Sequence, residues 1–130
     1  MATVWKTLGV DRDGGIEALK QGLSVEQIDE FLARTKLPAE SVFGVLGTTQ
    51  SEVIARGRLS QSESERLWRV ASVYISALSL FDDDATKALQ WLESSVPALG
   101  GASPLKHAET EPGASEVQSL VWQLEHGVAA

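Results

Sequence analysis

The fold of this chain is decided by residues 91–128, which read WLESSVPALGGASPLKHAETEPGASEVQSLVWQLEHGV. Glycine and proline fall in small groups between apolar runs, a spacing typical of helices joined by tight turns. The short runs suit helical turns, and the last one has apolar residues at helical spacing. From start to end we predict a helix closing near Trp91, a turn over 97–101, a helical turn after Pro104, a break at Gly113, and an amphipathic helix from Ala114 to His126.

Helix signals also dominate the rest of the chain, and no alternating apolar–polar run is long enough to predict a strand. We therefore predict an all-α fold. Residues 1–14 read as a tail ending in a turn cluster. The longest helix is predicted from a cap at Ser60 or Ser62 to about Phe81. Further helices are predicted over 16–22, from a capping box at Ser24 and Gln27, from Pro38 to Leu46 before Gly47, and from Thr48 to Gly57.

The longest predicted helix is apolar nearly all round, which indicates burial on more than one side. We interpret it as a linker between two halves of the chain. Residues 1–80 would form the N-terminal half, and residues 81–130 would form a small helical C-terminal domain. Asp82, Asp83 and Asp84 would end the long helix and cap the next one.

Composition excludes several classes of protein. The chain has no cysteine, so it has no disulfide and no thiolate metal site. No apolar run is long enough to span a membrane, and the N-terminus lacks the pattern of a secretory signal, so we expect a cytoplasmic protein. No nucleophile, base and metal set stands at a recognisable spacing. We therefore expect neither an enzyme nor a cofactor.

Charge is distributed unevenly along the 130 residues, whose formal net charge is −7. Residues 34–69 carry six basic and four acidic side chains, whereas residues 70–130 carry two basic and eight acidic ones. A basic middle is suited to a nucleic-acid contact, and an acidic end is suited to a basic partner.

Residues 40–56 have the spacing of a helix-turn-helix, with Gly47 in the turn. Apolar residues on both sides would hold the two helices together. In such a motif the start of the second helix enters the major groove, and later cations contact phosphates. A carboxylate near phosphates is unfavourable, so Glu52 suits DNA binding only when it pairs with Arg56 one turn later. The alternative is a plain helical hairpin in the core. The apolar residues are Val42, Phe43, Leu46, Val53 and Ile54, and the predicted DNA-binding residues are Thr48, Thr49, Gln50, Ser51, Arg56 and Arg58.

On the residues quoted first, together with the run from Leu59 to Arg69, the chain resembles the Xre/MbcA/ParS-type bacterial antitoxins. The resemblance implies an N-terminal Xre-like helix-turn-helix domain and a C-terminal toxin-binding domain. It also implies a homodimer that represses its own operon by binding operator DNA. The cognate toxin of such a protein is often a RES-domain enzyme that depletes NAD⁺, and the antitoxin covers its active-site entrance.

Trp122 is the candidate anchor for that toxin, because the helical step turns it away from the apolar stripe of the last helix. Trp122 could instead pack on the long helix or on a second protomer. A stand-alone DNA-binding regulator, with a C-terminal domain that only dimerises, is the alternative function. With the resemblance, the predicted toxin-binding residues are Trp122, Glu125, His126, Gly127 and Val128.

Overall fold

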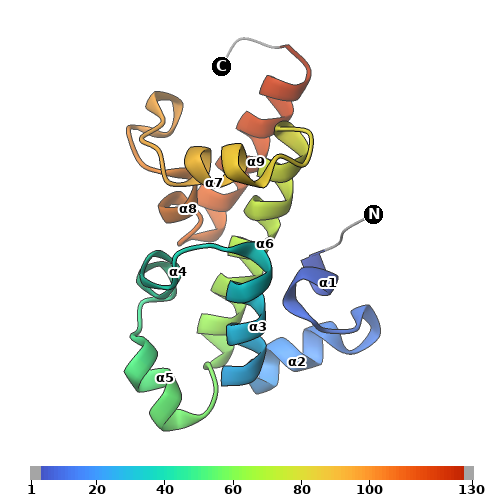
Figure 1. Cartoon of the computed structure of the whole chain (residues 1–130), viewed down its shortest axis with the longest axis vertical. Coiled ribbons are helices and arrows are strands. Elements are labelled where there is room, and N and C mark those ends of the chain that lie inside the picture. The colour runs from blue at the N-terminus through green and yellow to red at the C-terminus, as the bar shows by residue number, and fades with distance from the viewer. Residues whose placement is uncertain (1–3, 128–130) are drawn as a thin grey trace.

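The structure, a computed structural model, describes residues 4–127, and every regular element in that range is a helix. The predicted all-α fold is confirmed (Figure 1). Within residues 4–127, no helix is long and apolar enough to cross a membrane. The elements are α1 Val4–Leu8, η1 Arg12–Gly14, α2 Gly15–Gln21, α3 Val25–Thr35, α4 Ala39–Leu46, α5 Gln50–Arg56, α6 Gln61–Leu80, α7 Ala85–Leu92, η2 Pro97–Leu99, α8 Pro104–His107 and α9 Glu111–Glu125.

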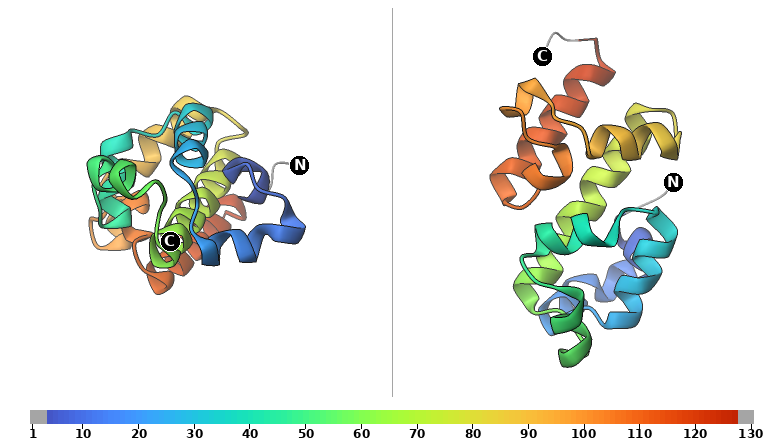
Figure 2. Two further views of the ribbon diagram at one scale, coloured as in Figure 1. Left: turned by 90° about the horizontal axis from the view of Figure 1, so that it is seen from below. Right: turned by 60° about the vertical axis from the view of Figure 1, so that its left-hand side comes forward.

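Helix α6 is the central element. It begins at a capping box in which the Ser60 hydroxyl accepts from the Glu63 amide at 3.1 Å and the Glu63 carboxylate accepts from the Ser60 amide at 2.9 Å. Of the two predicted caps, Ser60 is therefore the one used. Helix α6 packs against α1, α2, α4, α7, α8 and α9. Figure 2 shows it passing between the N-terminal helices and the C-terminal ones, which confirms the predicted burial on more than one side.

The N-terminal segment corrects one prediction. Residues 4–14 were expected to belong to a tail, but α1 and η1 fold back onto the rest of the chain and Leu8 is buried. The rings of Trp5 and Trp68 have centroids 5.9 Å apart, so Trp5 packs on its own chain. Gly15 makes room for this contact, because a Cβ there would lie 2.6 Å from the Trp5 ring. A five-residue helix is too short to show helical periodicity, which is why the pattern missed it.

Helix α9 begins at Glu111, before the predicted start at Ala114. The Thr110 hydroxyl accepts from the Gly113 amide at 3.1 Å and so caps the helix three residues earlier. The expected break at Gly113 is wrong, since this glycine lies inside the first turn. A Cβ at Gly113 would lie 1.9 Å from the His107 carbonyl oxygen. The glycine therefore allows α9 to approach the end of α8 closely.

One apolar core runs through both halves of the described chain. Helix α6 supplies buried side chains along most of its length, so the two halves share the same central helix. The division of the chain at residues 80 and 81 stays a prediction. The buried apolar residues of α6 are Leu67, Val70, Ala71, Val73, Tyr74 and Ala77.

Candidate functional site

Helices α4 and α5 meet at the turn that the sequence predicted. Gly47 ends α4 with a left-handed φ of 78°, and the Thr49 hydroxyl caps α5 by accepting from the Glu52 amide at 3.2 Å. The predicted burial of Val42, Phe43, Leu46 and Val53 is confirmed. The predicted burial of Ile54 is wrong, because this side chain is 59% exposed. Helix α5 is two turns long and buries only a narrow face around Val53.

The four residues predicted to enter the major groove lie at the start of α5, where Thr48 and Thr49 precede the helix and Gln50 and Ser51 begin it. Gln50 and Ser51 are exposed to solvent. Thr49 uses its hydroxyl as the cap of α5, and Thr48 donates its hydroxyl to the Glu52 carboxylate at 2.8 Å. The two threonines thus stabilise the start of the helix, while the side chains of Gln50 and Ser51 lie on the outside of the molecule.

The two arginines predicted to contact phosphates have partners within the chain. Arg56 donates to both carboxylate oxygens of Glu63, at 3.0 and 3.2 Å. Arg58 donates to the main-chain carbonyl of Gln21 at 3.2 Å. Arg56 therefore pairs with Glu63 in place of Glu52, the partner that would make Glu52 compatible with a DNA contact. Glu63 competes better because its capping box holds it in place with two oxygens facing the guanidinium.

The second candidate surface lies at the other end of α6, where α9 ends (Figure 1). Trp122 is 56% exposed, and its ring stacks on the imidazole of His126 with centroids 4.2 Å apart. The His126 ring nitrogen Nδ1 lies 2.7 Å from the Trp122 carbonyl oxygen, which fixes the imidazole over the indole. The two rings form an aromatic stack, and the exposure of Trp122 agrees with the prediction that it points away from the apolar stripe.

A hollow of about 820 Å³ lies beside this aromatic pair, between α6 and α9. Trp122 forms part of its wall, and the rest combines apolar and acidic side chains. Glu125 accepts a hydrogen bond from the Ser79 hydroxyl at 2.7 Å, which joins the two helices at the end of the hollow. The acidic side chains that line it are Asp82, Asp83 and Glu125.

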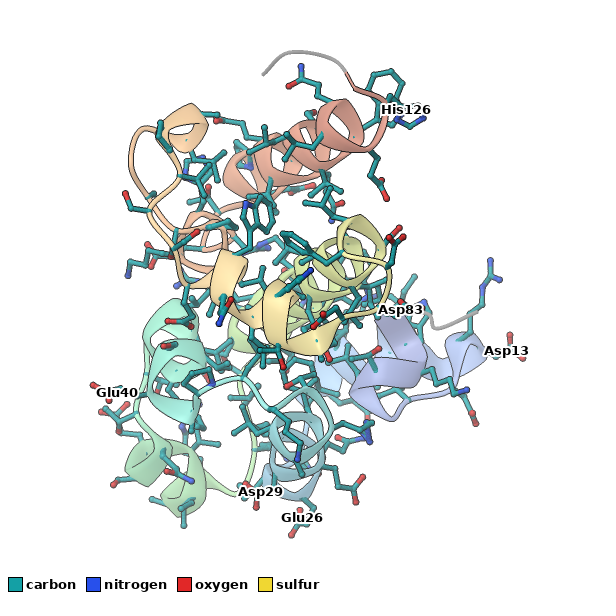
Figure 3. The ribbon with its side chains drawn as sticks, turned by 45° about the horizontal axis from the view of Figure 1, so that its top comes forward. Asp13, Glu26, Asp29, Glu40, Asp83 and His126 are labelled. Atoms are coloured by element: carbon teal, nitrogen blue, oxygen red, sulfur yellow. The ribbon has the colours of Figure 1, made fainter. Side chains whose placement is uncertain are left out.

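Asp82 and Asp83 were predicted only as helix-ending residues, and their place in this wall was missed. Both adopt left-handed backbone, with φ of 53° and 65°, and the Asp83 amide donates to the Leu78 carbonyl at 2.7 Å. Only Asp84 caps α7, by accepting from the Lys87 amide at 3.1 Å. Asp82 and Asp83 thus leave the cap to Asp84, and their carboxylates line the hollow. Figure 3 shows Asp83 and His126 on the outside of the C-terminal half.

The predicted toxin-binding residues therefore lie mostly in one place. Trp122, Glu125 and His126 share the last turns of α9 and the residue that follows it. Gly127 is exposed and has a left-handed φ of 68°. Val128 lies outside the described residues. We call Asp82, Asp83, Trp122, Glu125 and His126 the C-terminal platform.

Comparison with known proteins adds the family. Residues 76–127 match the antitoxin Xre/MbcA/ParS C-terminal toxin-binding domain. Antitoxin Xre of Yersinia enterocolitica is 33% identical over 96% of this chain and 89% of its own length. The chain belongs to the Xre/MbcA/ParS antitoxin family. It is thus an antitoxin of a toxin–antitoxin system.

Two further relatives of this antitoxin are similar over almost the whole chain. Antitoxin Xre of Photorhabdus laumondii is 27% identical over 98% of this chain and 90% of its own length. A Prs ADP-ribosylating antitoxin of Sphingobium is 24% identical over 98% of this chain and 86% of its own length. The domain match begins inside α6, so the family's toxin-binding domain includes the end of the central helix and every residue of the C-terminal platform.

Proposed function

We propose that this antitoxin neutralises a cognate toxin by laying its C-terminal platform over the entrance of the toxin's active site. The observation that carries the proposal is Trp122, a large aromatic side chain left 56% exposed inside the matched toxin-binding segment. Exposed tryptophans that become buried in a partner commonly dominate the binding energy of an interface. Occlusion requires binding alone, so the chain itself needs no catalytic group.

The charge of the platform indicates the chemistry of the partner. Asp82, Asp83 and Glu125 stand around Trp122, and residues 70–130 carry eight acidic and two basic side chains. An acidic surface favours a basic partner and speeds the encounter with it. A RES-domain toxin that depletes NAD⁺ would have such a surface, because a pocket for the phosphates of NAD⁺ is expected to be basic. The two proteins would meet in the cytoplasm.

The test is co-expression with the product of the adjacent reading frame. The wild-type antitoxin should rescue growth and co-elute with that product. Trp122→Ala should weaken the purified complex by roughly 30-fold, the ratio that corresponds to about 2 kcal/mol. Ile16→Ala is the matched control, since Ile16 is an exposed apolar side chain, at 65%, on α2, which lies at the opposite end of the molecule from the end of α9 (Figure 1). Isothermal titration calorimetry measures both variants.

Two results would contradict the proposal at different levels. A neighbouring protein that does not co-elute with the wild-type antitoxin would remove the proposed partnership. A stable complex that Trp122→Ala and Ile16→Ala leave equally tight would keep the partnership and exclude the platform as its contact. Growth rescue by Trp122→Ala in the second case would agree with the calorimetry.

A second candidate function is operator binding by α4 and α5. The observation that favours it is the exposed start of α5, where Gln50 and Ser51 follow the left-handed glycine, Gly47, that ends α4. In such a motif a glutamine can bond an adenine edge with two hydrogen bonds. With a homodimer, the two half-sites would lie about 34 Å apart, one turn of the duplex. The antitoxin would then repress its own operon.

Fluorescence anisotropy with a duplex from upstream of the antitoxin's own reading frame tests operator binding. Gln50→Ala should weaken binding to that duplex more than to a scrambled one. Arg58→Ala should weaken binding to both and lower the slope of log affinity against log salt by about one. If Trp122→Ala abolished only complex formation while Gln50→Ala abolished all repression, both surfaces would be functional.

If the antitoxin had no toxin partner, the alternative function, a stand-alone DNA-binding regulator, would describe it better.

A further inference from the structure

The arginines of the basic middle differ in a way that the sequence does not show. Residues 34–69 contain five of them, and each guanidinium has a hydrogen-bond partner within the described chain. Four donate to main-chain carbonyls, which are neutral and leave the positive charge uncompensated. The pairs are Arg34 with Thr7 at 3.2 Å, Arg58 with Gln21 at 3.2 Å, Arg66 with Val45 at 3.3 Å, and Arg69 with Ala108 and Glu109 at 3.3 and 3.0 Å.

Arg56 is the exception among these five, because its partner is a carboxylate. Its two terminal nitrogens face the two oxygens of Glu63 at 3.0 and 3.2 Å, the two-pronged geometry in which arginine pairs most strongly. The Thr48 hydroxyl accepts a further bond from Arg56 at 3.3 Å and donates to Glu52. Two carboxylates therefore surround the one cation that lies in the last turn of α5.

Glu63 is fixed by its own helix, and the Arg56 side chain beside it is the more exposed of the two. The capping box bonds Glu63 to Ser60 in both directions, and the Glu63 side chain is 17% exposed. The Arg56 side chain is 42% exposed. Burial acts to raise the pKa of Glu63, but the hydrogen bonds from Arg56 and Ser60 outweigh it, and the pKa lies below its ordinary value. The carboxylate is thus charged at neutral pH and pairs with Arg56 as an anion.

Binding of DNA depends on cations that neutralise phosphates and release their counterions. A phosphate approaching the end of α5 must take Arg56 from Glu63 and then lie near a carboxylate that has lost its partner. We propose that Glu63 limits the affinity of this antitoxin for DNA by holding Arg56 away from the phosphate backbone. The inference rests on the proposed operator binding.

The test compares two variants that remove the same charge from the same turn of α6. In Glu63→Gln the side chain can still accept from the Ser60 amide, because glutamine also serves at this position of a capping box. Glu65→Gln is the matched control, since Glu65 is exposed and bonds Gln61 at 3.0 Å. Affinity for a fluorescein-labelled 30-base-pair duplex from upstream of the reading frame is measured by anisotropy at several salt concentrations.

Glu63→Gln should bind the duplex several-fold more tightly than wild type and steepen the salt slope by about 0.9, the contribution of one phosphate contact. Glu65→Gln should give a smaller gain and leave the slope unchanged. Adding Arg56→Ala to Glu63→Gln should abolish the gain, because the released cation is then absent. Unchanged melting temperatures exclude an effect on folding.

Three results would overturn the inference. Equal effects of Glu63→Gln and Glu65→Gln would mean that only net charge matters. Weaker binding by Glu63→Gln would mean that the carboxylate positions Arg56 for DNA. No binding of the duplex at low salt by wild type or by Glu63→Gln would remove operator binding as well. In the first two cases operator binding by the wild type would still stand.

Discussion

At the scale of single residues, the glycines show how a small side chain can serve opposite purposes. Gly113 and Gly44 both lie inside helices, in α9 and α4. A Cβ at Gly113 would meet the His107 carbonyl oxygen at 1.9 Å, whereas a Cβ at Gly44 would meet nothing within 4 Å. The first glycine is required by packing, and the second only loosens its helix.

The same substitution at the two positions should therefore have opposite effects. Gly113→Ala should lower the free energy of unfolding by about 3 kcal/mol, because α8 and α9 must move apart. Gly44→Ala should raise it by about 0.5–1 kcal/mol, because alanine loses less backbone freedom in a helix. Urea unfolding followed by circular dichroism measures both. Equal small gains from the two variants would show that α9 does not need its close approach to His107.

The predicted helix caps held, because a cap is a local interaction. The caps at Ser24, Ser60 and Asp84 follow from side chains that bond their own helix a few residues away. The partners of the arginines could not be predicted in this way, because Arg56 and Glu63 belong to different helices. Which carboxylate pairs with Arg56 depends on how α5 packs beside α6. That packing cannot be predicted from the residue pattern of either helix alone.

At the scale of elements, the N-terminal arm formed by α1 and η1 is the clearest departure from the sequence pattern. Tertiary contacts of Trp5, Leu8 and Trp68 hold the arm in place. Its own sequence shows no helical periodicity. Short helices are unstable alone, so the arm depends on the surface that α3 and α6 offer it. The predicted start of α9 was wrong for a similar reason. Gly113 is needed for the close contact with α8, which the sequence pattern does not show.

Trp5→Ala should destabilise the protein by about 2 kcal/mol, the cost of losing a half-buried aromatic contact. Trp122→Ala is the matched control: it removes the same side chain from an exposed position and should cost less than about 0.5 kcal/mol. Limited proteolysis of the Trp5 variant should then cut within residues 4–14 first. If both variants had the same urea midpoint, the arm would contribute nothing to the fold.

At the scale of the whole molecule, α6 makes the two halves depend on each other. Its buried side chains belong to one continuous core, and α7, α8 and α9 all pack on it. A fragment that lacks α6 also lacks the surface on which the C-terminal helices pack. Unfolding should therefore be a single cooperative event across the described chain.

This dependence can be tested with a fragment. Residues 81–130 alone should give a circular dichroism spectrum with little helix and no cooperative melting transition. The full chain should unfold with the same midpoint by circular dichroism and by tryptophan fluorescence. A cooperatively melting fragment 81–130 would support the predicted domain division at residues 80 and 81 as a folding boundary.

Sequence alone predicted the all-α class, the central helix and the direction of Trp122 away from the apolar stripe, because each follows from periodicity along one helix. The C-terminal platform was only half predicted. Trp122, Glu125 and His126 are close in sequence, but Asp82 and Asp83 join them only because α6 and α9 lie side by side. The cross-helix bond between Ser79 and Glu125 likewise depends on that packing.

The left-handed backbone at Asp82 and Asp83 has one last consequence. Asparagine and glycine adopt this conformation at least as easily as aspartate does. Replacing Asp82 or Asp83 by asparagine or glycine thus removes one negative charge without altering the backbone conformation. Related antitoxins must not bind one another's toxins. Sequence differences that separate such antitoxins could accumulate at these two positions at little cost to the fold.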